Sequence, residues 1–263
     1  LDTNWRWQLC QLRSHYDAYI RRRVIYERQL EDRVNALLAQ SPQIGADRAM
    51  EQSQEILHLA LTAPAAADLR IHIEEIALSL YTIIGFQTSV KKYHASGLNR
   101  GAIIDFLDLP MNNRLWLEDE FAKIKTLSSE QEKIDRLEVI QKWETPGDGS
   151  FYDDVGTLDR STHLVRGEGL ETDPLMERNP NPGIWIWEDG FSRLRLSWLV
   201  SMDRPVAMVY ENLDPSAAYD VRVTGYFVDK IQMNGEWVEP FVWSDEKGAM
   251  VEYHVPAKAI KTG

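Results

Sequence analysis

Apolar residues recur every three or four positions through the first half of the chain, which is the spacing of one face of a helix. Between residues 4 and 39 this spacing predicts one long amphipathic helix. Ser41-Pro42 interrupts the pattern, and Asp47 is suited to cap a second helix. A third helix is predicted from about residue 66 to residue 95. Short turns between the three predict antiparallel neighbours in a helical bundle.

The next part of the chain predicts a loop followed by two shorter helices. Residues 99–114 fit neither the helical nor the strand period and predict an ordered loop. Asn113 is suited to cap a helix from Leu115 to about Leu127. Ser128 or Ser129, with Gln131 or Glu132 three residues later, provides a capping box for a last helix.

After about residue 150 the apolar period changes from 3.6 to 2, which predicts strands. The predicted strands cover residues 184–187, 191–200, 206–210, 219–228 and 250–255, with a hairpin at Asn234-Gly235. Asn-Gly is the dipeptide that two-residue hairpin turns favour. Short strands separated by turns, with no helix between them, predict an antiparallel β-sandwich of jelly-roll or immunoglobulin-like type.

The two patterns together predict an α+β protein with an N-terminal antiparallel helical bundle followed by the β-sandwich. The predicted domains are a helical domain over 1–146, an ordered connector over 147–183 and a sandwich over 184–263. Glycine, aspartate and serine keep the start of the connector out of regular structure, while Phe151, Tyr152 and Val155 give it side chains to bury. The ends of the sequence lead us to expect a fragment of a longer polypeptide, with the sandwich truncated at its C-terminus.

The charge balance makes some partners unfavourable. The formal net charge is −12, and 20 acidic against 11 basic residues after Glu144 place most of it in the second half. A negative chain without a basic stripe is unsuited to sequence-independent binding of nucleic acid or of an anionic membrane surface. A single cysteine, Cys10, excludes an internal disulfide and a multi-cysteine zinc site. No apolar run is long enough to span a membrane as a helix.

The search for motifs that carry chemistry gives few positions. The sequence has no H-E-x-x-H, no P-loop and no G-x-S-x-G motif. The six histidines are dispersed. His72 with Glu74 or Glu75 places potential metal ligands on one helix, but a single helical histidine is usually structural or solvated, so we predict no zinc site.

An acidic loop is the sharpest candidate for a site. Asp148, Asp153, Asp154 and Asp159 lie within a dozen residues of one another, close to glycines. Turn and capping roles are the structural interpretation. Asp148, Asp153 and Asp154 can also supply oxygen ligands to calcium, although their spacing differs from that of an EF-hand. A third interpretation is acid–base chemistry on a glycosidic bond.

Tryptophans in the predicted sandwich are the other candidates. Trp185 and Trp187 share one face of a strand by the period of 2, and Trp237 and Trp243 flank the predicted hairpin. Exposed indole rings can stack on the C–H faces of sugars. Packing in a core is the alternative for each of them, because tryptophan is mostly buried.

Four segments carry a resemblance to known proteins. Residues 213–223, LDPSAAYDVRV, resemble the turn-to-strand element of carbohydrate-binding and fibronectin-like sandwiches appended to secreted bacterial enzymes. Together with GSFYDD (149–154), HLVRG (163–167) and PMNNRLWL (110–117), they make the chain resemble the C-terminal region of large secreted proteins of environmental bacteria. Those proteins look like glycoside hydrolases whose catalytic barrel lies upstream of a helical region and a sandwich.

The resemblance implies a non-catalytic accessory region of a larger secreted or periplasmic carbohydrate-active enzyme. Its partners would be the upstream catalytic domain, which the helical part braces, and polysaccharide. The family offers no catalytic residue in this region to carry over. Two alternatives stay open. One is a catalytic unit with an interdomain acidic site acting on glycans, with Asp153 or Asp154 as acid or base and Arg114 holding an anionic substrate. The other is a structural interaction protein.

Overall fold

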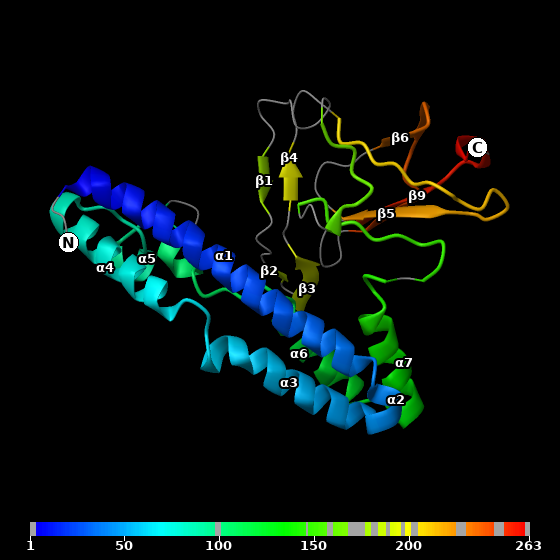
Figure 1. Ribbon diagram of the computed structural model, residues 1–263, viewed down its shortest axis with the longest axis horizontal. Helices are drawn as coiled ribbons and strands as arrows, with labels where there is room; N and C mark the ends of the chain where they lie inside the picture. Colours follow the sequence, from blue (N-terminus) through cyan, green and yellow to red (C-terminus); the bar gives the residue numbers. More distant parts are fainter. Residues whose placement is uncertain are drawn as a thin grey trace. The chain divides into compact units, whose positions relative to one another are not determined.

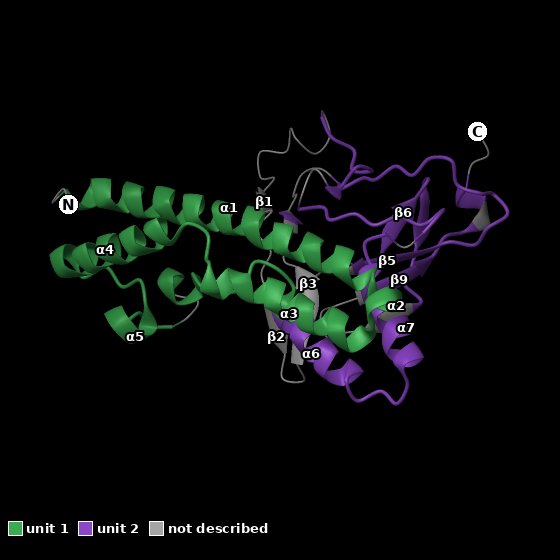
Figure 2. Ribbon diagram, turned by 60° about the horizontal axis from the view of Figure 1, so that its bottom comes forward, with its two compact units in different colours: residues 1–114 green, residues 115–263 purple. Residues whose placement is uncertain are grey.

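The computed structural model describes residues 4–97, 101–145, 147–156, 160–167, 177–179, 184–187, 190–195, 198–200, 205–224, 230–244 and 250–260. The chain divides into two compact units, Leu1–Arg114 and Leu115–Gly263, which Figure 2 draws in different colours. The helix α6 (Arg114–Ile124) begins at this boundary. From Leu115 on, it and the later helices therefore belong to the same unit as the strands. The boundary between the units therefore does not coincide with the change of period near residue 150.

The first unit is built on α1 (Trp5–Leu38), which confirms the predicted long helix. Asn4 caps it, because its Oδ1 accepts hydrogen bonds from the backbone N–H groups of Arg6 and Trp7 at 3.1 and 3.4 Å. The elements that follow in this unit are α2 (Ser41–Ile44), α3 (Ala46–Thr62), α4 (Ala67–Ile84), α5 (Val90–Tyr93) and the 3-10 helix η1 (Ile103–Phe106).

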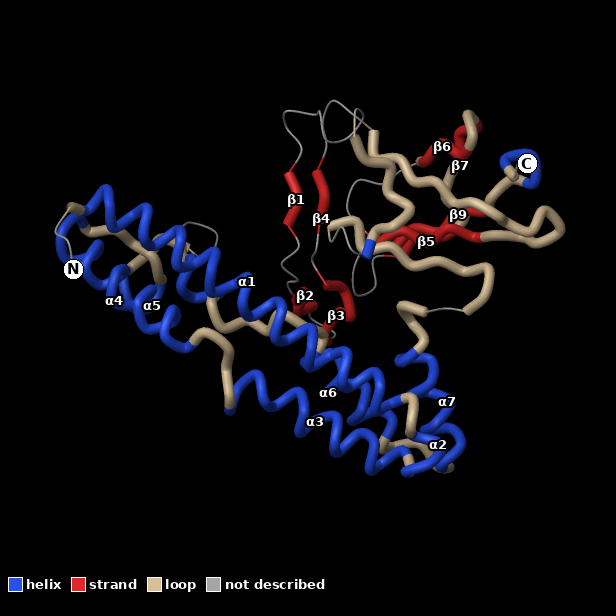
Figure 3. Tube along the Cα trace, viewed as in Figure 1, coloured by secondary structure: helices blue, strands red, loops and turns tan. Residues whose placement is uncertain are grey.

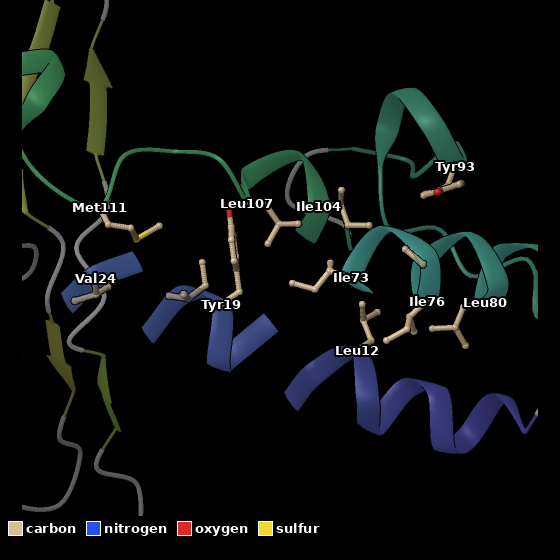
Figure 4. Close-up of a cluster of buried hydrophobic side chains, with 12 residues drawn as sticks. Leu12, Tyr19, Val24, Ile73, Ile76, Leu80, Tyr93, Ile104, Leu107 and Met111 are labelled. Carbon is tan, nitrogen blue, oxygen red and sulfur yellow. The ribbon is translucent and has the colours of Figure 1, made fainter. Parts of the chain in front are cut away.

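Helices α3 and α4 lie one after the other along α1, α3 beside its C-terminal half and α4 beside its N-terminal half (Figure 1). The predicted bundle of three neighbouring helices is thus a long helix paired with two shorter ones in succession. Figure 4 shows Leu12 of α1 pointing toward Ile73 and Ile76 of α4, and Tyr19 pointing toward Leu107. This buried cluster holds the N-terminal half of α1 in place.

Two helix ends differ from those predicted. The helix predicted to continue to residue 95 ends at Ile84, because Gly85 adopts a left-handed conformation with φ of 67°. The N–H of Gly85 then bonds to the Leu80 and Tyr81 carbonyls, as in other glycine-terminated helices. Asp47 does not cap α3 but lies in its first turn, where its charge suits the helix dipole.

A buried ion pair connects α1 to the loop formed by residues 107–113. Arg23 Nη2 and Glu27 Oε1 are 2.6 Å apart, and both side chains are buried. Three main-chain groups of the loop bind this pair: the carbonyls of Leu107 and Leu109 accept from Arg23, and the N–H of Met111 donates to Glu27. The pair and these three groups, which we call the Arg23–Glu27 clamp, fix the loop on α1.

In the second unit, α6 and α7 (Glu130–Gln141) are joined by buried charge. Ser129 and Glu132 form the capping box of α7, which confirms one of the predicted alternatives. Glu120 of α6 is buried and binds Arg136 of α7 at 2.5 Å and Lys123 at 3.0 Å. Burial acts to raise the pKa of Glu120, but hydrogen bonds and charge from Arg136 and Lys123 outweigh it and lower the pKa.

Glu120 is therefore expected to make stability depend on pH in the acid range. Its folded pKa is below the ordinary value of 4.5, so its contribution is complete above about pH 4.5 and is lost as the pH falls through the folded pKa. We expect the stability advantage of the wild type over Glu120→Gln to disappear over that range. Urea unfolding at a series of pH values measures it. Glu138→Gln, at an exposed pair with Lys142, is the control and should show no such loss.

The strands of the second unit form separate small antiparallel sheets, and Figure 3 shows the strands as short red pieces. β1 (Glu177–Asn179) pairs with β4 (Trp198–Val200), and β2 (Ile184–Trp187) pairs with β3 (Gly190–Arg195). β9 (Met250–His254) lies between β5 (Asp220–Thr224) and β8 (Val242–Ser244), and β6 (Ile231–Met233) pairs with β7 (Glu236–Val238). The 3-10 helix η4 (Ala257–Ala259) follows.

The predicted β-sandwich is wrong for the described residues. A sandwich needs two broad sheets that bury facing apolar surfaces, whereas these sheets have two or three strands each. In β9, Val251 and Tyr253 are fully buried and alternate with more exposed residues. Residues 206–210, predicted as a strand, contribute a single bridge between Met208 and Leu164. Alternation in the sequence located strands, but it does not determine their partners.

The predicted hairpin of the β region is confirmed. Asn234 and Gly235 form the turn of the β6–β7 hairpin, with φ of 47° and 92°, as a type I′ turn requires. In the segment that carried the resemblance, the Tyr219 hydroxyl accepts a hydrogen bond from the N–H of Asp214 at 2.8 Å. Sandwich proteins use a similar tyrosine to fix a corner before a strand. Here the same local device precedes β5 in a small sheet.

Candidate functional site

Two extended segments that are distant in sequence pair in the second unit. The N–H of Val209 donates to the His163 carbonyl, and the N–H of Val165 donates to the Ala207 carbonyl, both at 2.9 Å. The bridge between Leu164 and Met208 lies between these bonds. The pairing brings the ring of His163 against the ring of Tyr210, with centroids 4.6 Å apart and planes 26° apart.

The loop that begins at Gly147 places the carboxylate of Asp153 beside these rings. Gly147 and Gly149 adopt left-handed conformations, with φ of 108° and 74°, which glycine tolerates without strain. The N–H of Asp154 then donates to the Arg160 carbonyl at 2.8 Å, and the Ser161 hydroxyl donates to the Asp154 carbonyl. These bonds close the loop and place Asp153 beside His163.

Asp153, His163 and Tyr210 form a hydrogen-bonded network. The carboxylate of Asp153 lies 2.9 Å from His163 Nδ1 and accepts from the Tyr210 hydroxyl at 3.1 Å. Its side chain is 5% exposed. Burial raises the pKa of Tyr210 most, and the charge of Asp153 and the hydrogen bond to Asp153 raise it further. The phenol therefore stays protonated and donates. Because a carboxylate accepts hydrogen bonds, we assign the proton between Asp153 and His163 to Nδ1 of the imidazole.

Aromatic packing fixes the orientation of the histidine ring. Phe151 meets His163 edge to face, at 5.0 Å between centroids and 76° between planes. The same ring lies 5.2 Å from Tyr210. Held by two rings and one carboxylate, the imidazole has little freedom to rotate.

A hollow of about 420 Å³ lies beside this network. It is lined by Glu144, Asp148, Ser150, Phe151, Tyr152 and His163, together with Thr145 and Gly147. Arg160 binds Glu144 at 2.8 Å and neutralises it. The hollow is shallow and largely open to solvent, and aromatic surface and polar groups share its lining. The hollow and the network together are the strongest candidate site in the described residues.

The structure places the acidic candidates in different environments. Asp153 is engaged in the buried network, Asp154 uses its backbone to close the loop, and Asp148 is exposed at the hollow. Asp159 lies outside the described residues. No group of three or more histidine, cysteine, aspartate or glutamate side chains in the described part of the chain is placed to hold a metal ion. The geometry therefore gives no support to calcium at Asp148, Asp153 and Asp154.

The remaining predicted residues are Arg114 and four tryptophans. Arg114 belongs to the first unit, where its N–H donates to Asn112 Oδ1 at 3.1 Å at the start of α6. Asn112 thus takes the capping contact predicted for Asn113. Trp237 of β7 is 64% exposed, with Lys230 Nζ 5.3 Å from its ring centre. The side chains of Trp185, Trp187 and Trp243 lie outside the described residues, although their backbones belong to β2 and β8.

Sequence reasoning missed His163 and Tyr210 as partners of Asp153. The acidic loop drew attention to Asp153, but His163 was one of six dispersed histidines. The pairing of residues 163–165 with 207–209 brings the three residues together, and no pattern within a short stretch of sequence predicts this pairing. A usable signal was the position of His163, ten residues after Asp153 and just beyond the loop.

Comparison with known proteins leaves the site to be judged on its geometry. No family model matches the chain, and no curated protein and no solved structure matches it either. The helices of the described residues include none with the length and apolar character needed to cross a membrane.

Proposed function

We propose that this chain binds polysaccharide as part of a larger secreted carbohydrate-active enzyme, with the hollow beside His163 as the binding site. The observation that carries this proposal is the pair of exposed aromatic side chains, Phe151 and Tyr152, on the wall of the hollow. They are 41% and 36% exposed. Aromatic faces next to polar groups suit sugars, which present both C–H faces and hydroxyls.

The charge of the site narrows the class of glycan. Asp148 is exposed at the hollow, and the whole chain carries a net charge of −12. Glu144 is balanced by Arg160, so the surroundings offer a bound acidic sugar no unpaired cation among the lining residues that the structure describes. Neutral glycans therefore fit the site better than sulfated or uronate-rich polymers, which like charge would repel.

The exposed Trp237 is a second place for a sugar ring. Its indole lies on β7, and Lys230 approaches its ring. A sugar stacked there would have to displace the lysine. We therefore assign the principal site to the hollow and an auxiliary contact to Trp237.

Affinity electrophoresis on gels containing neutral and acidic plant and algal polysaccharides tests the proposal. We expect retardation on at least one neutral gel and a weaker effect on acidic ones. Replacing Phe151 or Tyr152 with alanine should weaken binding about 5- to 10-fold, as expected for the loss of one aromatic contact of roughly 1 kcal/mol. Phe86→Ala, at an exposed aromatic residue of the first unit, is the matched control and should bind as the wild type does.

Each outcome bears on a different part of the proposal. Absence of retardation on every gel would contradict polysaccharide binding. Retardation that Trp237→Ala abolishes and Phe151→Ala leaves intact would move the site to β7. The connection to a larger enzyme is tested by the natural reading frame, where a catalytic barrel and a signal peptide are expected upstream.

A further inference from the structure

Packing alone does not account for the polar contacts around His163. Asp153 is buried and accepts hydrogen bonds from both His163 Nδ1 and the Tyr210 hydroxyl. A proton on Nδ1 leaves the lone pair of the neutral ring on Nε2, and no described residue forms a hydrogen bond with that atom. The His163 side chain is 24% exposed and lines the hollow. This combination of a buried carboxylate, a ring nitrogen held beside it and an accessible second nitrogen is that of a histidine general base.

We propose that His163 is the general base of an ester-hydrolysing site at the hollow, with Asp153 as a positioning residue. This inference goes beyond polysaccharide binding and does not depend on it. The substrate class is a carboxylic ester of an alcohol, such as an acyl group carried on a sugar hydroxyl. The acidic pair expected for cleavage of a glycosidic bond is not what the structure offers, because Asp153 is buried and already binds two donors.

The reaction balances with water as the second reactant. His163 Nε2 takes a proton from water as the water oxygen attacks the acyl carbon, forming a new C–O bond. The imidazolium then returns that proton to the departing alkoxide oxygen as the original ester C–O bond breaks. The products are a carboxylic acid and an alcohol, and His163 is neutral again. Ser150 also lines the hollow, but it shows no hydrogen bond to His163, so water is assigned as the nucleophile.

The chain contains a matched comparison for this arrangement. His254 Nδ1 lies 2.5 Å from Asp220 Oδ1, and its ring stacks on Phe241. Both side chains of that pair are more than half exposed. An exposed carboxylate is solvated and holds a histidine weakly. If an aspartate close to a histidine were sufficient for catalysis, both His163 and His254 would be active. The proposal requires that only His163 is active.

Hydrolysis of p-nitrophenyl acetate by the whole chain tests the proposal. We expect His163→Ala to lower kcat/KM roughly 100-fold, as for the loss of a general base, while His254→Ala stays within about 2-fold of the wild type. Free imidazole, after subtraction of its own rate, should restore activity to His163→Ala because it can occupy the vacated place. Asp153→Asn should lower kcat with KM unchanged, since a positioning residue acts through the base and not on the substrate.

A second measurement covers the case in which His163→Ala does not fold. Long-range ¹H–¹⁵N NMR of the wild-type protein reports the imidazole tautomer directly, and we expect the proton of neutral His163 on Nδ1. An Nε2–H tautomer would overturn the proposal, as would ester hydrolysis no faster than that of free imidazole at the same concentration. Equal losses for His163→Ala and His254→Ala would also overturn it. Failure of polysaccharide binding would leave this result unaffected.

Discussion

Glu27→Ala is expected to lower the free energy of unfolding of the first unit by about 3–5 kcal/mol, the range for breaking a buried ion pair. Removing the carboxylate leaves Arg23 charged and buried without its counter-ion, and leaves the N–H of Met111 without its acceptor. Both groups were taken out of water when the chain folded. Urea unfolding of the whole chain, followed by circular dichroism, measures the change.

Two controls separate burial from charge pairing in this prediction. Asp17→Ala breaks the Arg13–Asp17 pair, which is also spaced by four residues but exposed, and should cost less than about 0.5 kcal/mol. The double variant Arg23→Met/Glu27→Leu removes both charges. It should still be destabilised by about 2 kcal/mol or more, because the loop carbonyls lose their donor. Equal, small effects of Glu27→Ala and Asp17→Ala would contradict the clamp.

Leu80→Ala is expected to destabilise the same unit by about 2–5 kcal/mol. Leu80 is completely buried in the cluster between α4 and the first half of α1. The substitution removes apolar contacts and leaves a cavity that rigid neighbouring helices refill only in part. The shift of the urea midpoint at constant slope gives the value.

Leu78→Ala provides the comparison on the same helix. Leu78 is two residues away and 55% exposed, so its replacement should change stability by less than about 0.5 kcal/mol. Alanine is also a better helix former than leucine, which acts to raise the stability slightly. A loss at Leu78 as large as that at Leu80 would mean that the exposed face of α4 is covered in solution.

The helices could be predicted because their signals are local. The spacing of apolar residues fixed α1, and Ser129 with Glu132 fixed the start of α7. The end of α4 was missed because apolar residues continue past Gly85, whose left-handed conformation ended the helix. Its position inside an apolar run made that glycine look like an ordinary helical residue.

The sheets and the candidate site depended on contacts between distant segments. Alternation located β2 and the Asn234-Gly235 turn correctly, yet it could not show that the strands form separate small sheets. The same limit applied to the site. Asp153 was selected as part of an acidic loop, whereas its partners His163 and Tyr210 are brought to it by the pairing of residues 163–165 with 207–209.

The Arg23–Glu27 clamp has a consequence for how this chain can change during evolution. The clamp binds main-chain carbonyl and amide groups of the loop, so it depends on the number of residues between those groups. It does not depend on which side chain stands at a position such as the half-buried Leu109. Natural variants should therefore tolerate new side chains there more readily than a single inserted or deleted residue. An insertion would move every following group out of reach of its partner on α1.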